Sequence, residues 1–143
     1  MRLLFQCCCF LLIILWIYAG AGKLLNYEET KTQMAHQIFD ASFAGILSWL
    51  VPATEIVAGL LIAIPLTCRY GLFLSALLLF VFTIYILGGV LKWYESVPCS
   101  CGGILRHMSW GWHFLFNLFS LTLNTIALII QPKEGGGDTD QNK

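Results

Sequence analysis

The segment LLFQCCCFLLIILWIYAGAG, residues 3–22, contains no charged side chain and decides the class of fold. A helix rises about 1.5 Å per residue, so roughly 20 residues cross the hydrocarbon core of a bilayer. A cleaved signal peptide is the alternative, because Ala19, Gly20 and Ala21 resemble a cleavage site of small residues. The apolar run is longer than the roughly 7–15 residues of a signal-peptide core, which favours a membrane span.

Three further apolar segments are long enough to span a bilayer: residues 46–66, 70–93 and 110–130. The polar segment 26–40 separates the first two spans and predicts a short helix on the membrane surface. The sequence thus predicts an all-α fold, an integral membrane four-helix bundle that forms one domain over residues 1–131. The glycines and polar side chains of residues 132–143 predict a disordered tail.

The composition fits lipid rather than water as the solvent. Hydrophobic residues make up 58% of the 143-residue chain and charged residues 11%, whereas about a quarter of the residues in soluble domains are charged. The mean hydropathy is +0.77. Eight basic and eight acidic residues give a formal net charge of zero, so the chain has no basic excess for a nucleic acid. The predicted partner is the lipid bilayer.

An even number of spans places both termini on one side of the membrane and the two polar loops on the other. An excess of lysine and arginine marks the cytoplasmic side, but here the count is a tie. The terminal side carries Arg2, Arg69, Lys133 and Lys143, and the loop side carries Lys23, Lys31, Lys92 and Arg106. Lys23 is expected to reach the interface by snorkelling. Charge therefore leaves the orientation open.

Two of the six cysteines are predicted to carry chemistry. Cys99 and Cys101 lie in a polar loop at the membrane edge, between Pro98 and the pair Gly102-Gly103. In extended backbone, residues two apart point the same way, so both sulfurs face one side. A disulfide that closes so small a ring is strained, and strained disulfides suit exchange rather than stapling. The other four cysteines are expected to be small buried apolar residues: Cys7, Cys8, Cys9 and Cys68.

Arg106 and His107 follow the cysteine pair and are predicted to favour the thiolate, which is the nucleophile in exchange. The competing hypothesis is a copper or zinc site, for which Cys99, Cys101, His107 and His113 would be the ligands. Their spacing matches no common zinc pattern. An inert, reduced cysteine pair is the third interpretation.

Polar side chains inside the predicted spans are candidates for function, because placing them in lipid is costly. Glu55 follows Pro52 in the second span, and it is predicted either to bond a neighbouring helix as a protonated acid or to handle protons. The fourth span carries a helical stripe of polar residues at spacings of three and four: His113, Asn117, Ser120 and Asn124. This stripe either joins helices by side-chain hydrogen bonds or lines a path from the cysteine loop.

Three segments resemble the MauE/DoxX family of redox-associated membrane proteins. They are Tyr18-Ala19-Gly20-Ala21-Gly22-Lys23-Leu24, Pro52-Ala53-Thr54-Glu55 and Val97-Pro98-Cys99-Ser100-Cys101-Gly102-Gly103. The resemblance extends over the four spans and their loops, and the cysteine segment is its most specific part. Cys99 and Cys101 match the paired cysteines of the family.

The resemblance implies a DoxX-like four-helix bundle in the bacterial inner membrane, with both termini cytoplasmic and the Cys99–Cys101 loop periplasmic. It implies thiol–disulfide exchange with a periplasmic thioredoxin-fold partner, in support of the maturation of exported proteins. For MauE members that role lies in methylamine utilisation, through maturation of methylamine dehydrogenase. The sequence requires no cofactor; a membrane quinone is the candidate carrier of reducing equivalents, as in other small membrane oxidoreductases, and no metal is assigned. The alternatives are a copper-handling membrane protein and a non-catalytic membrane scaffold.

Overall fold

A computed structural model describes residues 1–35, 41–93 and 109–132, and this part of the chain contains five helices. They are α1 (Arg2–Leu25), α2 (Tyr27–Ala35), α3 (Ala41–Ala63), α4 (Cys68–Val90) and α5 (Trp110–Ile130). All but the short α2 are long and apolar enough to cross a membrane. The prediction of an all-α, four-helix membrane bundle is confirmed. The predicted disordered tail lies, from residue 133 on, outside the described residues.

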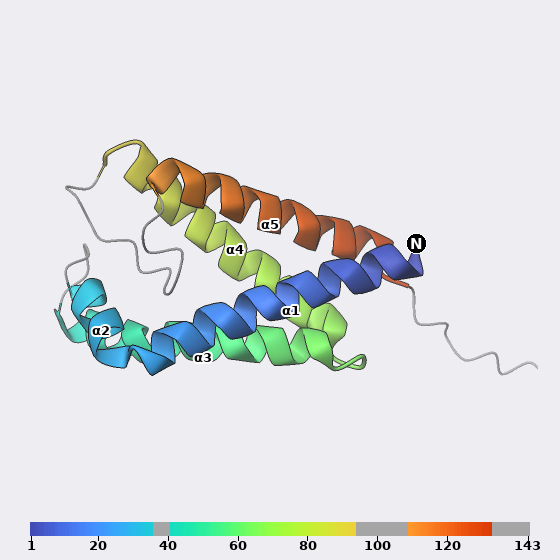
Figure 1. The fold of residues 1–143 in the computed structure, drawn as a ribbon, viewed down its shortest axis with the longest axis horizontal. Coiled ribbons are helices and arrows are strands. Elements are labelled where there is room, and N and C mark those ends of the chain that lie inside the picture. Colours follow the sequence, from blue (N-terminus) through green and yellow to red (C-terminus); the bar gives the residue numbers. More distant parts are fainter. Residues whose placement is uncertain (36–40, 94–108, 133–143) are drawn as a thin grey trace, which may run out of the picture.

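The four long helices form two closely packed pairs, α1 with α3 and α4 with α5 (Figure 1). Helix α3 turns into α4 at the end of the bundle where α1 begins and α5 finishes, and we call this the terminal end. At the opposite, loop end lie α2, the last turn of α4 and the first turn of α5. The segment that carries Cys99 and Cys101 joins α4 to α5, so both of its anchoring points are at the loop end.

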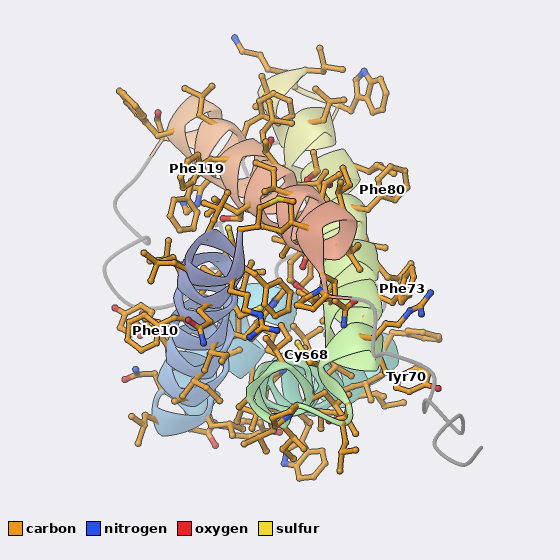
Figure 2. All side chains as sticks on the ribbon, turned by 90° about the vertical axis from the view of Figure 1, so that its right-hand side faces the viewer. Phe10, Cys68, Tyr70, Phe73, Phe80 and Phe119 are labelled. Carbon is orange, nitrogen blue, oxygen red and sulfur yellow. The ribbon has the colours of Figure 1, made fainter. Side chains whose placement is uncertain are left out.

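The outer surface of the bundle is apolar. Figure 2 shows Phe10, Phe73, Phe80 and Phe119 projecting away from the helices, and each of these rings is 55–62% exposed. Soluble monomers rarely expose contiguous apolar patches larger than a few hundred Å². A surface covered with such side chains therefore belongs in a lipid bilayer, as the composition predicts.

The interior combines a small apolar core with a few polar contacts. Leu12 and Trp16 of α1 are almost fully buried against Ala58 and Leu72 of the facing helices. The Trp16 indole Nε1 donates a hydrogen bond of 2.8 Å to Ser75 Oγ on α4, so α1 is linked diagonally across the bundle. Packing around this tryptophan holds the two helix pairs together.

The four cysteines of the described region do not all share one environment. Cys8, Cys9 and Cys68 are buried, as expected for small apolar residues. Cys7 is exposed on the outer surface, so the expectation that it is buried is wrong. The helical period explains the difference, because three consecutive residues on one helix cover most of its circumference.

Pro52 does not break the second span. Helix α3 runs without interruption from Ala41 to Ala63, with Pro52 inside it and buried. Thr54 Oγ1 donates a hydrogen bond of 2.8 Å to the carbonyl of Val51 beside the proline. Neighbouring helices and Ser/Thr side chains make proline tolerable within a membrane helix, so the helix continues and carries Glu55 into the bundle.

Candidate functional site

The predicted thiol site and its tuning residues lie outside the described residues: Cys99, Cys101, Arg106 and His107. The structure describes the two points between which this segment runs. Helix α4 ends in a Schellman turn, in which Trp93 N donates to Gly88 O at 3.0 Å and Lys92 N donates to Gly89 O at 3.2 Å. Lys92 takes the left-handed conformation with φ 57°, which reverses the chain away from the helix axis. Ser109 is the N-cap residue of α5.

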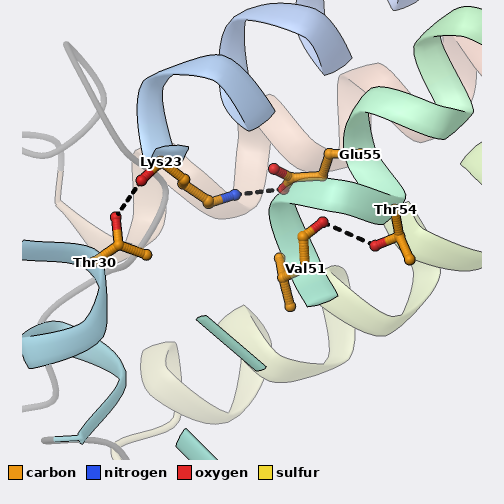
Figure 3. Close-up of polar contacts among 5 residues, drawn as sticks. All are labelled: Lys23, Thr30, Val51, Thr54 and Glu55. Carbon is orange, nitrogen blue, oxygen red and sulfur yellow. Dashed lines mark hydrogen bonds and ion pairs between the residues drawn. The ribbon is translucent and has the colours of Figure 1, made fainter. Parts of the chain in front are cut away.

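A buried ion pair joins Lys23 and Glu55 in the described bundle. Lys23 Nζ, from the last turn of α1, donates to Glu55 Oε1, from the middle of α3 (Figure 3). The side chains are only 5% and 1% exposed, so the pair is closed off from solvent and lipid alike. The expectation that Lys23 snorkels to the interface is wrong, because a buried carboxylate offers the ammonium a better partner than the interface does.

Contacts from two further helices, α2 and α4, hold this pair in place. Thr30 Oγ1 of α2 donates a hydrogen bond of 3.1 Å to the carbonyl of Lys23, which ties α2 to the end of α1 (Figure 3). The ammonium also lies over the ring of Phe82 of α4, with Nζ 5.7 Å from the ring centroid. This distance is within the range of a cation–π interaction. Lys23, on α1, therefore contacts residues of α2, α3 and α4.

Glycine makes the approach of α1 and α3 possible at this point. A methyl group on Gly20 would lie 2.7 Å from Ile56 Cγ1, 3.0 Å from the carbonyl oxygen of Pro52 and 3.4 Å from Glu55 Cβ. Small residues at such crossings allow helix backbones to come close in membranes. The Ala19-Gly20-Ala21-Gly22 segment thus brings Lys23 within reach of a carboxylate on the facing helix.

The polar stripe predicted on the fourth span faces the bundle interior. His113, Asn117, Ser120 and Asn124 are all buried on one face of α5. Asn117 Nδ2 donates to Leu79 O at 3.2 Å and to Thr83 Oγ1 at 3.0 Å. Asn124 Nδ2 donates to Leu72 O at 3.1 Å. Both amides join α5 to α4, which is the helix-joining role that the pattern suggested.

The Lys23–Glu55 pair and the amides of α5 are therefore two separate sets of interior polar groups. The ion pair lies between α1 and α3, and the two amides lie between α5 and α4. Sequence reasoning singled out Glu55 but missed its partner. The signal was present: Lys23 is the first charged residue after the apolar run that begins at Leu3, and it follows a row of small residues.

An apolar groove opens between α1 and α5 toward the lipid. It has a volume of about 350 Å³. Leu15, Tyr18, Phe119 and Ser120 are among the residues that line it, and Leu12 separates it from the core. Its walls are almost entirely apolar, with the Tyr18 and Ser120 side chains as the polar exceptions. Such a groove suits a lipid-soluble molecule.

Within the described ranges, no three His, Cys, Asp or Glu side chains are placed to hold a metal ion. Three of the four residues in the copper or zinc hypothesis lie in the 94–108 segment, outside the described ranges. The fourth, His113, is buried on α5 at 2% exposure.

A sequence profile of the family described as "Methylamine utilisation protein MauE" matches residues 1–130. The matched region contains all five helices, the Lys23–Glu55 pair and the Cys99–Cys101 segment. No curated protein and no solved structure gives a significant match to the chain.

Proposed function

This chain belongs to the MauE family, and on that premise we propose that it is a membrane thiol–disulfide component. Cys99 and Cys101 exchange disulfides with a periplasmic thioredoxin-fold protein and thereby support the maturation of exported proteins. The observation that carries the proposal is the Pro98-Cys99-Ser100-Cys101-Gly102-Gly103 segment, which connects α4 to α5 at the loop end of the bundle. The described residues that flank this segment, Trp93 and Ser109, lie at the loop end of the bundle.

The exchange conserves electrons and protons. A thiolate of one protein attacks a sulfur of the other protein's disulfide, and a mixed disulfide forms as a thiolate leaves. The second thiolate of the attacking pair resolves the mixed disulfide, so one pair is oxidised while the other is reduced. Arg106 and His107 favour the thiolate of the nearby cysteines in this scheme.

The buried ion pair supports an orientation with the termini in the cytoplasm. The positive-inside rule compares lysine and arginine residues near the membrane ends, and by sequence the two sides carry four each. Because Lys23 is buried and paired with Glu55, it is not a free interfacial charge. Removing it leaves three basic residues on the loop side against four on the terminal side (Arg2, Arg69, Lys133 and Lys143). The cysteine loop is then periplasmic in a bacterial inner membrane.

A membrane quinone is the proposed electron partner of the cycle. The groove between α1 and α5 offers a lipid-facing, apolar site of about 350 Å³. A quinone that accepts two electrons and two protons from a dithiol becomes a quinol, and the dithiol becomes a disulfide. This step would regenerate an oxidised Cys99–Cys101 pair after each exchange.

The test replaces each loop cysteine by serine in cells and measures the redox state of exported disulfide proteins and of thioredoxin-fold partners. Cys99→Ser and Cys101→Ser should each shift the partner population and trap or abolish the mixed disulfide. Cys7→Ser is the matched control, because that side chain is exposed on the outer surface of the bundle. An unchanged partner redox state in both loop variants would overturn the proposal.

Accessibility gives a second measurement. A membrane-impermeant thiol reagent applied to intact cells should label Cys99 and Cys101 only after mild reduction. Labelling without reduction would show free thiols and would favour a metal-handling protein or a scaffold. Labelling only after lysis would place the loop in the cytoplasm and contradict the orientation.

A further inference from the structure

The terminal end of the bundle contains a pocket that differs in chemistry from the groove between α1 and α5. It lies between the α3–α4 turn and the end of α5, and it has a volume of about 540 Å³. Arg69 and Gln131 line it together with the apolar residues Leu66, Phe73 and Leu128. The proposed exchange at the cysteine loop uses no part of this pocket.

Contacts between α3, α4 and α5 hold the walls of the pocket in place. Thr67 Oγ1 donates a hydrogen bond of 3.0 Å to Leu61 O, which fixes the turn before α4. A methyl group added at Gly71 would be 2.6 Å from a backbone nitrogen of α3, so the start of α4 is packed closely on that helix. Asn124 Nδ2 of α5 donates to Leu72 O of α4 at 3.1 Å. The pocket is therefore formed by helix ends that are already packed together.

The polar and apolar parts of the pocket follow the order of the parts of a phospholipid. One span begins here at Cys68 and another ends here at Ile130, so the pocket is at one boundary of the bilayer. Arg69 is in the first turn of α4, and Phe73 is one turn further, about 6 Å deeper along the helix axis. Figure 2 looks onto this end and shows Phe73 projecting outward from α4. The cationic group is thus at the level of lipid phosphates, and the ring is at the level of acyl chains.

The charge of Arg69 has no carboxylate near it in the part of the chain that the structure describes. The acidic residues of that part are Glu28, Glu29 and Glu55. The first two are on α2 at the loop end, and the third bonds Lys23. The Arg69 guanidinium lies over the Phe73 ring, with Cζ 6.0 Å from the ring centroid. One ring cannot use all five N–H donors of a guanidinium, and their fork geometry matches a phosphate group.

We propose that this pocket binds an anionic membrane phospholipid. The Arg69 guanidinium pairs with the lipid phosphate, and an acyl chain lies along Leu66, Phe73 and Leu128. The bound lipid thereby connects the start of α4 to the end of α5. Basic pockets between membrane helices bind lipid headgroups in this way. The pocket selects an anionic lipid over a zwitterionic one, because the described residues around it offer no carboxylate for a headgroup ammonium.

The C-terminal segment of the chain is the alternative occupant, since it begins beside the pocket. Pro132 lines the pocket, and residues 133–143 include the acidic residues Glu134, Asp138 and Asp140. That segment contains no hydrophobic residue to cover the apolar walls. A phospholipid supplies both the negative charge and the apolar chain, so it matches the whole of the pocket.

The experiment is native mass spectrometry of the full chain released from detergent micelles. The probes are phosphatidylglycerol and phosphatidylcholine with identical acyl chains. The parent should bind one phosphatidylglycerol at least about tenfold more tightly than phosphatidylcholine, because hydrogen bonds to a charged group account for roughly that factor or more. Arg69→Gln should remove this preference. Arg2→Gln is the matched control, since Arg2 is a basic residue at the same end of the bundle but does not line the pocket, and it should retain the preference.

Equal affinity of the parent for the two lipids, or an equal loss in Arg69→Gln and Arg2→Gln, would overturn the proposal. Far-UV circular dichroism of both variants establishes that the helices are still formed. Excess inorganic phosphate should leave the lipid bound, because it has no acyl chain. Displacement of the lipid by phosphate would show a site for free anions and would also overturn the proposal.

A chain that ends at Pro132 separates the lipid from the C-terminal segment. It should bind phosphatidylglycerol as tightly as the full chain does. Lipid binding that appears only in the shortened chain would identify residues 133–143 as the occupant and contradict the proposal. None of these variants alters Cys99 or Cys101, so every outcome is independent of the proposed exchange at the loop.

Discussion

The two helix pairs of this bundle are joined by different means. Helices α1 and α3 are joined by one buried ion pair, Lys23–Glu55, beside a close backbone approach at Gly20. Helices α4 and α5 are joined by two neutral amide side chains, Asn117 and Asn124, which bond backbone or hydroxyl oxygens. We call these two interfaces the α1–α3 seam and the α4–α5 seam. The α1–α3 seam has its polar interaction at one position, whereas the α4–α5 seam has polar interactions at two positions along the helix.

The difference decides how each seam responds to a single change. Removing one partner of a buried ion pair leaves an uncompensated charge in a medium of low polarity, at a cost of about 3–5 kcal/mol. Interhelical hydrogen bonds inside a membrane protein contribute about 0.6 kcal/mol on average, because the separated helices also find partners. The α1–α3 seam should therefore be fragile at a few positions, and the α4–α5 seam tolerant at each.

The largest effect is expected at Lys23. Lys23→Met leaves the Glu55 carboxylate buried without its ammonium, and should lower the free energy of unfolding by about 3–5 kcal/mol. The measurement is denaturant unfolding in lipid–detergent micelles, followed by tryptophan fluorescence. The double variant Lys23→Met/Glu55→Leu should recover most of the loss, because neither charge remains. If the single and double variants are equally unstable, charge burial is not what makes this seam fragile.

A smaller effect is expected at Gly20. Gly20→Ala forces its new methyl group against the Pro52 carbonyl and Ile56, and overpacking of this kind costs about 1–3 kcal/mol. Gly22→Ala is the matched control in the same helix, since nothing lies within 4 Å of its added methyl group. That control should be neutral or more stable by about 0.5–1 kcal/mol, because alanine is the better helix former. Equal destabilisation by both substitutions would show that α1 and α3 are not in close contact.

At the α4–α5 seam the expected loss is about 0.6–1.7 kcal/mol for Asn124→Leu. The substitution removes the bond to the Leu72 carbonyl while keeping an apolar side chain of similar size. The same unfolding assay measures it. A loss as large as that of Lys23→Met would contradict the view that this seam is distributed.

The smallest effect is expected for Thr122→Val and Thr125→Val, which should lie within about 0.5 kcal/mol of the parent. Both threonines are on the exposed side of α5, and their hydroxyls bond carbonyls of their own helix, Leu118 and Leu121. They calibrate the assay for polar groups that join no helices. A large effect at either position would mean that this face of α5 contacts something other than lipid.

Much of the fold follows from the sequence because the bilayer imposes a length on each element. About 20 apolar residues without charge form a spanning helix, since every backbone polar group must be bonded within the segment. The same logic identified the polar stripe of α5, because a spacing of three and four fixes one helix face. The interior position of Glu55 followed from the cost of exposing a carboxylate to lipid.

The interior contacts around Glu55 could not be predicted from the sequence in the same way. Lys23 was placed at the interface because its position at the end of a span allows snorkelling, yet the structure buries it. A proline inside a helix usually breaks or kinks it, yet α3 continues through Pro52. Both differences arise from neighbours on other helices, which supply a carboxylate in the first case and packing in the second.

The sequence by itself thus determined the number of spans, their approximate extent and which face of α5 turns inward. Only the tertiary structure decided which helices meet at which residues. The pairing of Lys23 with Glu55 depends on how each helix is rotated and crossed, and apolar length carries no information about rotation. The crossing of α1 and α3 depends on the close packing at Gly20, where an added methyl group would meet Ile56 and the Pro52 carbonyl. Such packing is a property of two helices together and not of either sequence segment alone.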